Sequence, residues 1–276
     1  MHAPGVALID TAVLAAPLLG ESSGVIASRR RPGVLWSIND SGNEPLLFAT
    51  DSTGADLGRL TVARASNVDW EDISAGPCPR SSGTCLYIAD TGDNQFQRRS
   101  VTIYVLPEPE PPLGPGDTAR VVRAESAIEL RFPDRPHDAE GLAVLGGHLL
   151  LVTKDRFGPA QLYRAPLSGT GPRLLEHVAS LAMRTSLLGG RIVTGAAVSR
   201  NGRLLVVRTY VSLHLFSLDG TALAALTDMD GITIPVVETQ GEAVCFDDAG
   251  RLILTSERGR RQHALLTRLR LTGVEP

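Results

Sequence analysis

Charged and polar side chains recur at the ends of short apolar segments along this chain, and they are the residues that can do chemistry. Carboxylate oxygens bind divalent cations, and carboxylates and histidine transfer protons. The glutamates at the starts of apolar segments are Glu21, Glu71, Glu140 and Glu242. The residues at the ends of the segments that follow are Asn39, Asp40, Asp90, Asp93, Lys154, Arg208 and Glu257. A binding or acid–base site is predicted if the fold brings the two sets together.

The segments that carry these residues belong to a repeat that is written about five times, each copy with three or four short strand-like stretches. Residues 34–39, 86–90 and 204–208 are examples of its second stretch. Tight turns with glycine, such as residues 200–203 and 248–251, separate the first stretch from the second. This pattern predicts an all-β chain, a β-propeller whose blades are the repeats.

Five blades are predicted, in a single propeller domain over residues 1–276. The last repeat lacks a fourth strand, and residues 6–16 can supply it, which would join the chain ends and cover open sheet edges. Six blades are the alternative, because residues 107–139 and 217–240 can each hide further strands. Trp36 and Trp70 are predicted to pack between blades.

In a propeller blade the first strand lies nearest the axis and the second runs back antiparallel to it. The start of the first strand and the end of the second therefore meet at one end of the axis, and the residues named above converge there. Two carboxylates 4 Å apart repel by about 4 kcal/mol at an effective dielectric constant of 20. A bound cation or raised pKa values would relieve this repulsion. Ligands with oxygen only favour Ca²⁺ over Zn²⁺, with Mg²⁺ and Mn²⁺ as alternatives.

Basic residues and a histidine fall at the same end of the predicted blades. Lys154 and Arg208 can hold a negative group of a substrate, and Glu257 completes this substrate-binding set. Asp40, Asp93 and His137 are the candidates for proton transfer. Each acid also has a plain structural alternative, because acids at blade ends bind backbone N–H groups and form turns.

Composition narrows the class of partner. The net charge is −3, and the basic run at residues 29–31 is predicted to be a solvated turn, so a nucleic-acid partner is not expected. No apolar run is long enough to cross a bilayer. Cys78 and Cys85 flank a turn-forming loop and are predicted to form a disulfide, with two unpaired thiols as the alternative. A disulfide favours a secreted or extracytoplasmic protein, with the cytoplasm as the alternative. Cys245 is predicted to be a core residue, and the protein to be a monomer.

Four motifs, at residues 36–42, 69–73, 86–94 and 136–140, resemble those of a group of mostly secreted bacterial propeller proteins without an assigned activity. More loosely, an axial metal held by glutamate, asparagine and aspartate is similar to gluconolactonase/regucalcin-like and paraoxonase-like propellers, which hydrolyse lactones or esters. A count of five blades departs from those proteins. The metal ligands that this resemblance implies are Glu21, Asn39, Glu71, Asp90, Glu140 and Glu242.

Three hypotheses follow for function. The first is a metal-dependent enzyme that hydrolyses a small polar lactone, ester or phosphoester in an acidic axial funnel. The second is a propeller without catalysis that binds a sugar, a peptide or a cationic ligand in the same funnel. The third is a scaffold in which the acids serve only contacts between blades.

Overall fold

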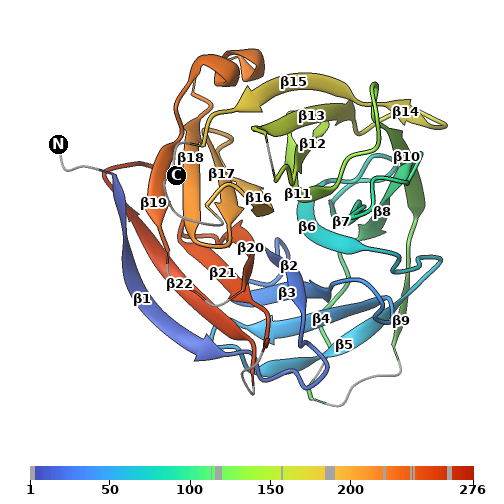
Figure 1. The fold of residues 1–276 in the computed structure, drawn as a ribbon. Coiled ribbons are helices and arrows are strands. Elements are labelled where there is room, and N and C mark those ends of the chain that lie inside the picture. The colour runs from blue at the N-terminus through green and yellow to red at the C-terminus, as the bar shows by residue number, and fades with distance from the viewer. Residues whose placement is uncertain are drawn as a thin grey trace.

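The fold is a ring of five small β-sheets (Figure 1), which confirms the prediction of a five-bladed β-propeller. The computed structural model describes residues 4–112, 114–115, 120–156, 158–183, 190–219, 222–236, 238, 240–259 and 263–276. The first strand of each blade lies at the centre of the ring, and each of these inner strands contacts the inner strands of both neighbouring blades. None of the helices among the described residues is long and apolar enough to cross a membrane.

Each blade is a sheet in which successive strands pair antiparallel. Blade 1 contains β2 (Ser22–Ala27), β3 (Val34–Asn39), β4 (Leu46–Asp51) and β5 (Asp56–Ala63). Blade 2 contains β6 (Trp70–Pro77), β7 (Thr84–Asp90), β8 (Val101–Pro107) and β10 (Ser126–Arg131). Blade 3 contains β11 (Ala139–Leu145), β12 (His148–Thr153), β13 (Ala160–Pro166) and β15 (Glu176–Leu181). Blade 4 contains β16 (Val193–Val198), β17 (Leu204–Thr209), β18 (Ser212–Ser217) and β19 (Ile232–Pro235), with the 3₁₀ helix η1 (Leu223–Asp228) before β19.

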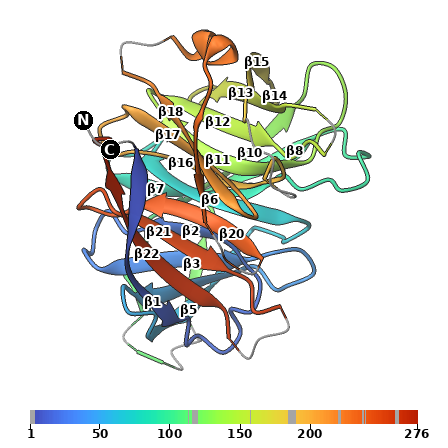
Figure 2. The ribbon, with the colours of Figure 1, turned by 60° about the vertical axis from the view of Figure 1, so that its left-hand side comes forward.

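Blade 5 joins the two ends of the chain. It contains β20 (Gly241–Phe246), β21 (Leu252–Ser256), β22 (Leu265–Thr272) and, as its outer strand, β1 (Gly5–Val13). β1 runs antiparallel to β22, with Gly5 opposite Thr272 and Val13 opposite Leu265. Figure 2 shows the two strands side by side. The predicted closure of the last blade by the N-terminal strand is therefore confirmed, and it removes an open edge from the ring.

The regions that could have held a sixth blade instead extend existing blades. β10 and β19 are the outer strands of blades 2 and 4. Two short strands, β9 (Val121–Arg123) and β14 (Arg173–Leu174), pair parallel to the outer edges of blades 1 and 2. Each comes from the blade that follows in sequence, so these pairings tie neighbouring blades together and cover exposed edges.

The apolar core lies between neighbouring blades, so the inner strands are buried on both faces. Trp36 and Trp70 are fully buried, which confirms their predicted role in packing. Cys245 is fully buried as predicted.

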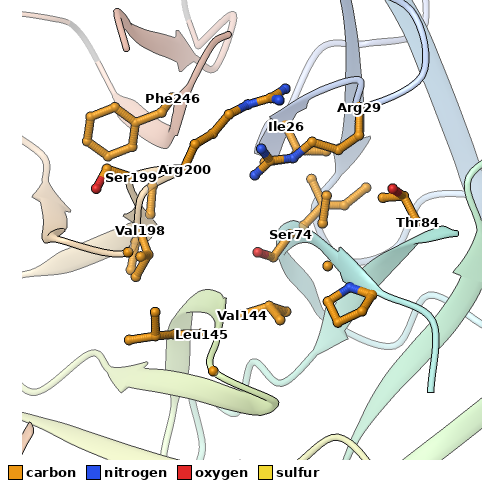
Figure 3. Close-up of a pocket in the computed structure, with 18 of the residues that line it drawn as sticks. Ile26, Arg29, Ser74, Thr84, Val144, Leu145, Val198, Ser199, Arg200 and Phe246 are labelled. Atoms are coloured by element: carbon orange, nitrogen blue, oxygen red, sulfur yellow. The ribbon is translucent and has the colours of Figure 1, made fainter. Parts of the chain in front are cut away.

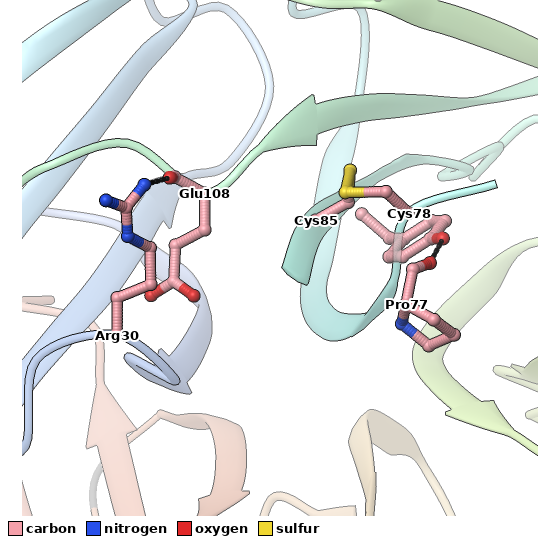
Figure 4. Close-up of a disulfide and its surroundings, with 6 residues drawn as sticks. Arg30, Pro77, Cys78, Cys85 and Glu108 are labelled. Carbon is pink, nitrogen blue, oxygen red and sulfur yellow. Dashed lines mark hydrogen bonds between the residues drawn. A yellow bond between two sulfur atoms is a disulfide. The ribbon is translucent and has the colours of Figure 1, made fainter. Parts of the chain in front are cut away.

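A disulfide and a buried glutamate fix the loops at one end of blades 1 and 2 (Figure 4). Cys78 and Cys85 are bonded as predicted, across the β6–β7 hairpin. Glu108, just after β8, accepts hydrogen bonds from the Ser28 hydroxyl at 2.6 Å and from the Trp36 indole at 3.2 Å. Its carbonyl oxygen accepts one from the Arg30 guanidinium at 2.9 Å. The start of the proline-rich loop after β8 is thereby tied to blade 1.

Candidate cation site at the acidic end of the axis

A β-bulge interrupts the pairing near the start of every inner strand. A bulge leaves a residue out of the ladder and re-aims its side chain. The residues left out are Ser23, Glu71, Glu140, Thr194 and, in blade 5, Glu242 with Ala243. Equivalent positions of five blades therefore face one another at this end of the axis, and three of them hold glutamates.

In each blade, the position after the first residue left out of the ladder is crowded. Its occupants in the five blades are Gly24, Asp72, Gly141, Gly195 and Ala243. A Cβ atom at Gly24 would come within 2.8 Å of the Ile73 backbone nitrogen, and one at Gly141 within 2.7 Å of the Ala196 Cβ. Asp72 is the exception among these small residues, and it is fully buried. Its carboxylate accepts hydrogen bonds from the backbone N–H groups of Ile73 at 2.8 Å, Leu142 at 2.8 Å and Ala196 at 3.2 Å. Asp72 thus links β6, β11 and β16 at the centre of the ring.

Glu71 belongs to two groups of carboxylates. One carboxylate oxygen from each of Asp40, Asp69 and Glu71 lies within 4.8 Å of the other two. The same holds for Glu71, Asp138 and Glu140, which are all buried. The Lys154 ammonium lies 2.6 Å from the Glu140 carboxylate, at the buried edge of the second group. Asp69, Glu71 and Asp138 have no ion pair within the part of the chain that the structure describes.

The pKa values of these acids are raised because burial disfavours the charged form and neighbouring acids repel it. Burial and then the charge of Glu140 raise the pKa of Glu71 well above its ordinary value. Burial raises the pKa of Glu140 to about 7, although Lys154 opposes the shift. Burial and the charges of Asp40 and Asp138 raise the pKa of Asp69 to about 6. Without a cation, the site therefore retains protons near neutral pH.

Glu242 and Glu257 extend the acidic end into blade 5. Burial, followed by the charges of Glu140 and Glu257, raises the pKa of Glu242 well above its ordinary value. Burial and the charge of Asp40 raise that of Glu257. Burial and the charge of Glu242 raise the pKa of Tyr210 to about 12. Acids of blades 1, 2, 3 and 5 thus share this end of the axis.

Glu21 is not the blade 1 equivalent of Glu71, so that part of the prediction is wrong. Ser22 pairs with Asn39 as Trp70 pairs with Asp90, so Ser23 is the residue of blade 1 that is equivalent to Glu71. Glu21 is exposed, and its carboxylate accepts a hydrogen bond from the Asn43 amide at 2.7 Å. Its counterpart in blade 2 is Asp69.

Three predicted metal-site or proton-transfer residues serve the loops around the site. Asp90 and Asp93 belong to neither group of carboxylates, and Asn39 is the last residue of β3. Asn39 accepts a hydrogen bond from the Glu21 N–H at 3.2 Å and donates one to the Leu18 carbonyl at 2.7 Å. Asp90 accepts one from the Asp69 N–H at 3.2 Å and forms an ion pair with Arg98 at 2.8 Å.

Asp93 accepts hydrogen bonds from the backbone N–H groups of Gln97 at 2.9 Å and Arg98 at 2.8 Å. The side chains of Asn39, Asp90 and Asp93 therefore hold the loops around the site.

His137 and Arg208 also have partners within the fold. The His137 Nε2 atom lies 3.1 Å from Asp134 and 3.1 Å from the Tyr163 hydroxyl, and the ring is buried. Arg208 is buried, forms an ion pair with Glu238 and donates to the Thr255 carbonyl at 2.9 Å. Both side chains thus stabilise blade structure. Of the predicted cationic pair, only Lys154 contacts a member of the two groups of carboxylates, Glu140.

Two members of the site, Asp69 and Asp138, were not among the residues predicted from the sequence. Both precede a bulge glutamate by two residues, in the sequence Asp-x-Glu at 69–71 and 138–140. In each pair the two acids are members of the same group of carboxylates. The repeated spacing was the signal that could have identified them.

The chain thus defines a five-bladed propeller with an acidic site at one end of its axis. No family model matches the chain, and no curated protein sequence matches it. Among solved structures, it is similar to the WD40 repeats of RRP9, with 13% identity, a TM-score of 0.47, and 96% of this chain and 100% of that chain covered. It is also similar to a gluconolactonase from Xanthomonas campestris, with 14% identity, a TM-score of 0.47, and 90% and 72% covered. The five sheets of the chain itself, and not these likenesses, establish the architecture.

Proposed function

We propose that the acidic end of the axis binds a divalent cation, Ca²⁺ first, and that the protein hydrolyses a small polar lactone, ester or phosphoester there. The observation that carries the proposal is Glu71, a buried carboxylate shared by two groups of acids that no arginine neutralises among the described residues. Several buried carboxylates without counter-charges are costly unless a cation or protons compensate them.

The donor set fits a hard cation. All side-chain donors of the two groups are carboxylate oxygens, with no cysteine or histidine among them. Ca²⁺ binds six to eight oxygens at about 2.4 Å, so two oxygens on opposite sides of the ion lie about 4.8 Å apart. The spacing of Glu71, Asp138 and Glu140, within 4.8 Å of one another, is compatible with one ion between them. Waters and substrate oxygens would fill the remaining positions.

Each residue then has a defined part. Glu71, Asp138 and Glu140 would hold the cation, which would polarise a carbonyl or phosphoryl oxygen and lower the pKa of a bound water. Lys154 offsets the charge of Glu140 and offers N–H donors to an anionic group of the substrate. Of the three predicted proton-transfer residues, only Asp40 is a member of one of the two groups of carboxylates. Proton transfer would therefore be carried out by Asp40, with Asp69 beside it.

A second function uses the same acids without catalysis. Asp69, Glu71 and Asp138 without ion pairs would attract the ammonium group of a cationic ligand as well as a metal ion. Retention of an alkylammonium probe without any metal and without turnover would select this function.

The disulfide suits an oxidising compartment, and we propose an extracytoplasmic location. Monomeric state and the absence of a nucleic-acid partner stay predictions from the sequence.

The test is hydrolysis by protein stripped with a chelator and then supplied with Ca²⁺. A set of lactones, p-nitrophenyl esters and p-nitrophenyl phosphodiesters covers the proposed substrates. We expect turnover with Ca²⁺ only, and a loss of about 100-fold or more in Glu71→Gln and Glu140→Gln. Glu129→Gln, on the outer strand β10, is the matched control and should keep full activity. Equal turnover in chelator, or unchanged rates in both site variants, would overturn the proposal.

A further inference from the structure

The opposite end of the axis contains a cavity of about 580 Å³, shown in Figure 3. The last residues of the five inner strands form its walls, together with the turns that follow β2, β11 and β16. Ile26, Val144, Leu145, Val198 and Phe246 contribute apolar side chains to this wall. The cavity therefore has room for a small organic molecule and apolar surface to pack against it.

Arg29 brings a positive charge to this cavity without a partner from the protein. Its side chain is half-buried, and its guanidinium makes no hydrogen bond or ion pair within the described part of the chain. Only its backbone N–H is bound, to Glu108 at 3.0 Å. An unpaired, partly desolvated guanidinium is costly, and it offers five N–H donors to an anion.

Arg200 is the second arginine of the cavity. It comes from the turn between β16 and β17, and it forms an ion pair with Asp248. Figure 3 shows the side chains of Arg29 and Arg200 extending toward each other across the opening. Burial and the charge of Arg200 lower the pKa of Arg29, as expected for two cations that share a site.

Asp72 separates this cavity from the acidic site. Its buried carboxylate occupies the centre of the ring between Glu71, at the acidic end, and Ile73 and Ser74, which line the cavity. Ligands at the two ends therefore bind without direct contact, and an anion is repelled by one end and attracted by the other.

The geometry points to a binding site for a small organic anion, a monocarboxylate with an apolar body. Its carboxylate would pair with the Arg29 guanidinium beside Arg200, and its apolar body would pack against Ile26, Val144 and Leu145. The inference is independent of the proposed hydrolase function because it uses none of the acids at the other end.

The test is calorimetric titration of the whole protein with sodium octanoate, with 1-octanol and inorganic phosphate as reference ligands. We expect saturable binding of octanoate, and binding about tenfold weaker or worse for octanol and for phosphate, because each lacks one of the two features. Arg29→Gln should weaken octanoate binding about tenfold or more, and Arg29→Lys should restore part of it.

Three controls keep this test decisive. Arg270→Gln, an exposed arginine on β22, should bind octanoate as the unchanged protein does. Glu71→Gln should also bind it unchanged, so a failure of the hydrolase proposal leaves this inference standing. Thermal melts of each variant show whether it is folded. No octanoate binding by the folded protein, equal binding by Arg29→Gln, or equal binding of octanol would overturn the inference.

Discussion

The two ends of the propeller axis are built from the same five strands but have opposite chemistry. At the acidic end, the starts of the inner strands carry Glu71, Glu140 and Glu242, and Lys154 is paired with one of them. At the other end, the same strands finish in apolar residues, and the following turns supply Arg29 and Arg200. Asp72 lies between the two ends.

The difference between the ends comes from the position of the bulges. Each bulge lies near the start of its strand, so it redirects acids toward the axis at one end only. Toward the other end the ladders are regular, and the small or apolar residues pack as an ordinary core. All five inner strands run in the same direction along the axis, so their starts lie at one end and their last residues at the other. A ring of repeats can therefore form two unlike sites.

The largest expected effect on the free energy of unfolding concerns Arg208, a structural arginine, in contrast to Arg29, the proposed binding arginine. Arg208 is buried in an ion pair with Glu238 and bonded to carbonyls of β20 and β21. Arg208→Gln should lower the free energy of unfolding by about 3–5 kcal/mol, since it leaves Glu238 buried without its partner. Urea unfolding followed by circular dichroism measures this. A loss below about 1 kcal/mol would show that this arginine is not structural.

Asp72, which lies between the two ends of the axis, gives the next prediction. Asp72→Ala removes the acceptor of three backbone N–H groups, two of them in β11 and β16. We expect a loss of about 3 kcal/mol in the free energy of unfolding, because buried donors without acceptors are costly. Asp72→Asn keeps one acceptor oxygen and should lose less. If both variants unfold at the urea concentration of the unchanged protein, Asp72 does not hold the ring together.

The pH dependence of stability tests whether the acidic end is strained without a cation. Burial raises the pKa of Glu140 to about 7 and that of Glu71 and Glu242 well above their ordinary values. The folded protein then holds protons that the unfolded chain has released above about pH 4.5, so stability falls as pH rises from about 5 to 8.

In chelator, we expect a fall on the order of 2 kcal/mol over this range, measured by urea unfolding at each pH. Glu242→Gln should reduce the fall, and Glu129→Gln should not. Stability that rises from pH 5 to pH 8 would contradict the assignment of raised pKa values.

The smallest expected effect concerns Arg29. Because its guanidinium forms no hydrogen bond or ion pair with a described residue, Arg29→Gln should change the free energy of unfolding by less than about 0.5 kcal/mol. Urea unfolding without added anions provides the measurement, with Arg208→Gln as the contrast. A loss above about 2 kcal/mol would show that Arg29 supports the fold and is not reserved for a ligand.

The ring could be predicted from the sequence because strand, turn and acid recur in the same order in successive repeats. The five blades and the convergence of Glu71, Glu140 and Glu242 followed from that repeat. The closure by β1 followed from the missing fourth strand of the last repeat, and the disulfide from two cysteines that flank a turn-forming loop. The equivalence of Glu21 with Glu71 failed because Ser23, two residues after Glu21, occupies the bulge position of blade 1, and the sequence does not mark which residue is left out of the ladder.

Other partners depended on contacts distant in sequence. His137 bonds to Tyr163, and Arg208 pairs with Glu238 across blade 4, so position along a strand did not reveal these structural roles. Arg29 was expected in a solvated turn, but its half-buried side chain extends into a cavity formed by all five blades.

Calorimetric titration of Ca²⁺ into chelator-treated protein at pH 8 and low salt tests the central claim most directly. We predict saturable binding to the unchanged protein and no measurable binding to Glu71→Gln, whose side chain belongs to both carboxylate groups. Glu129→Gln should bind as the unchanged protein does. Absence of binding to the unchanged protein, or equal binding to Glu71→Gln, would contradict a cation site at the acidic end of the axis.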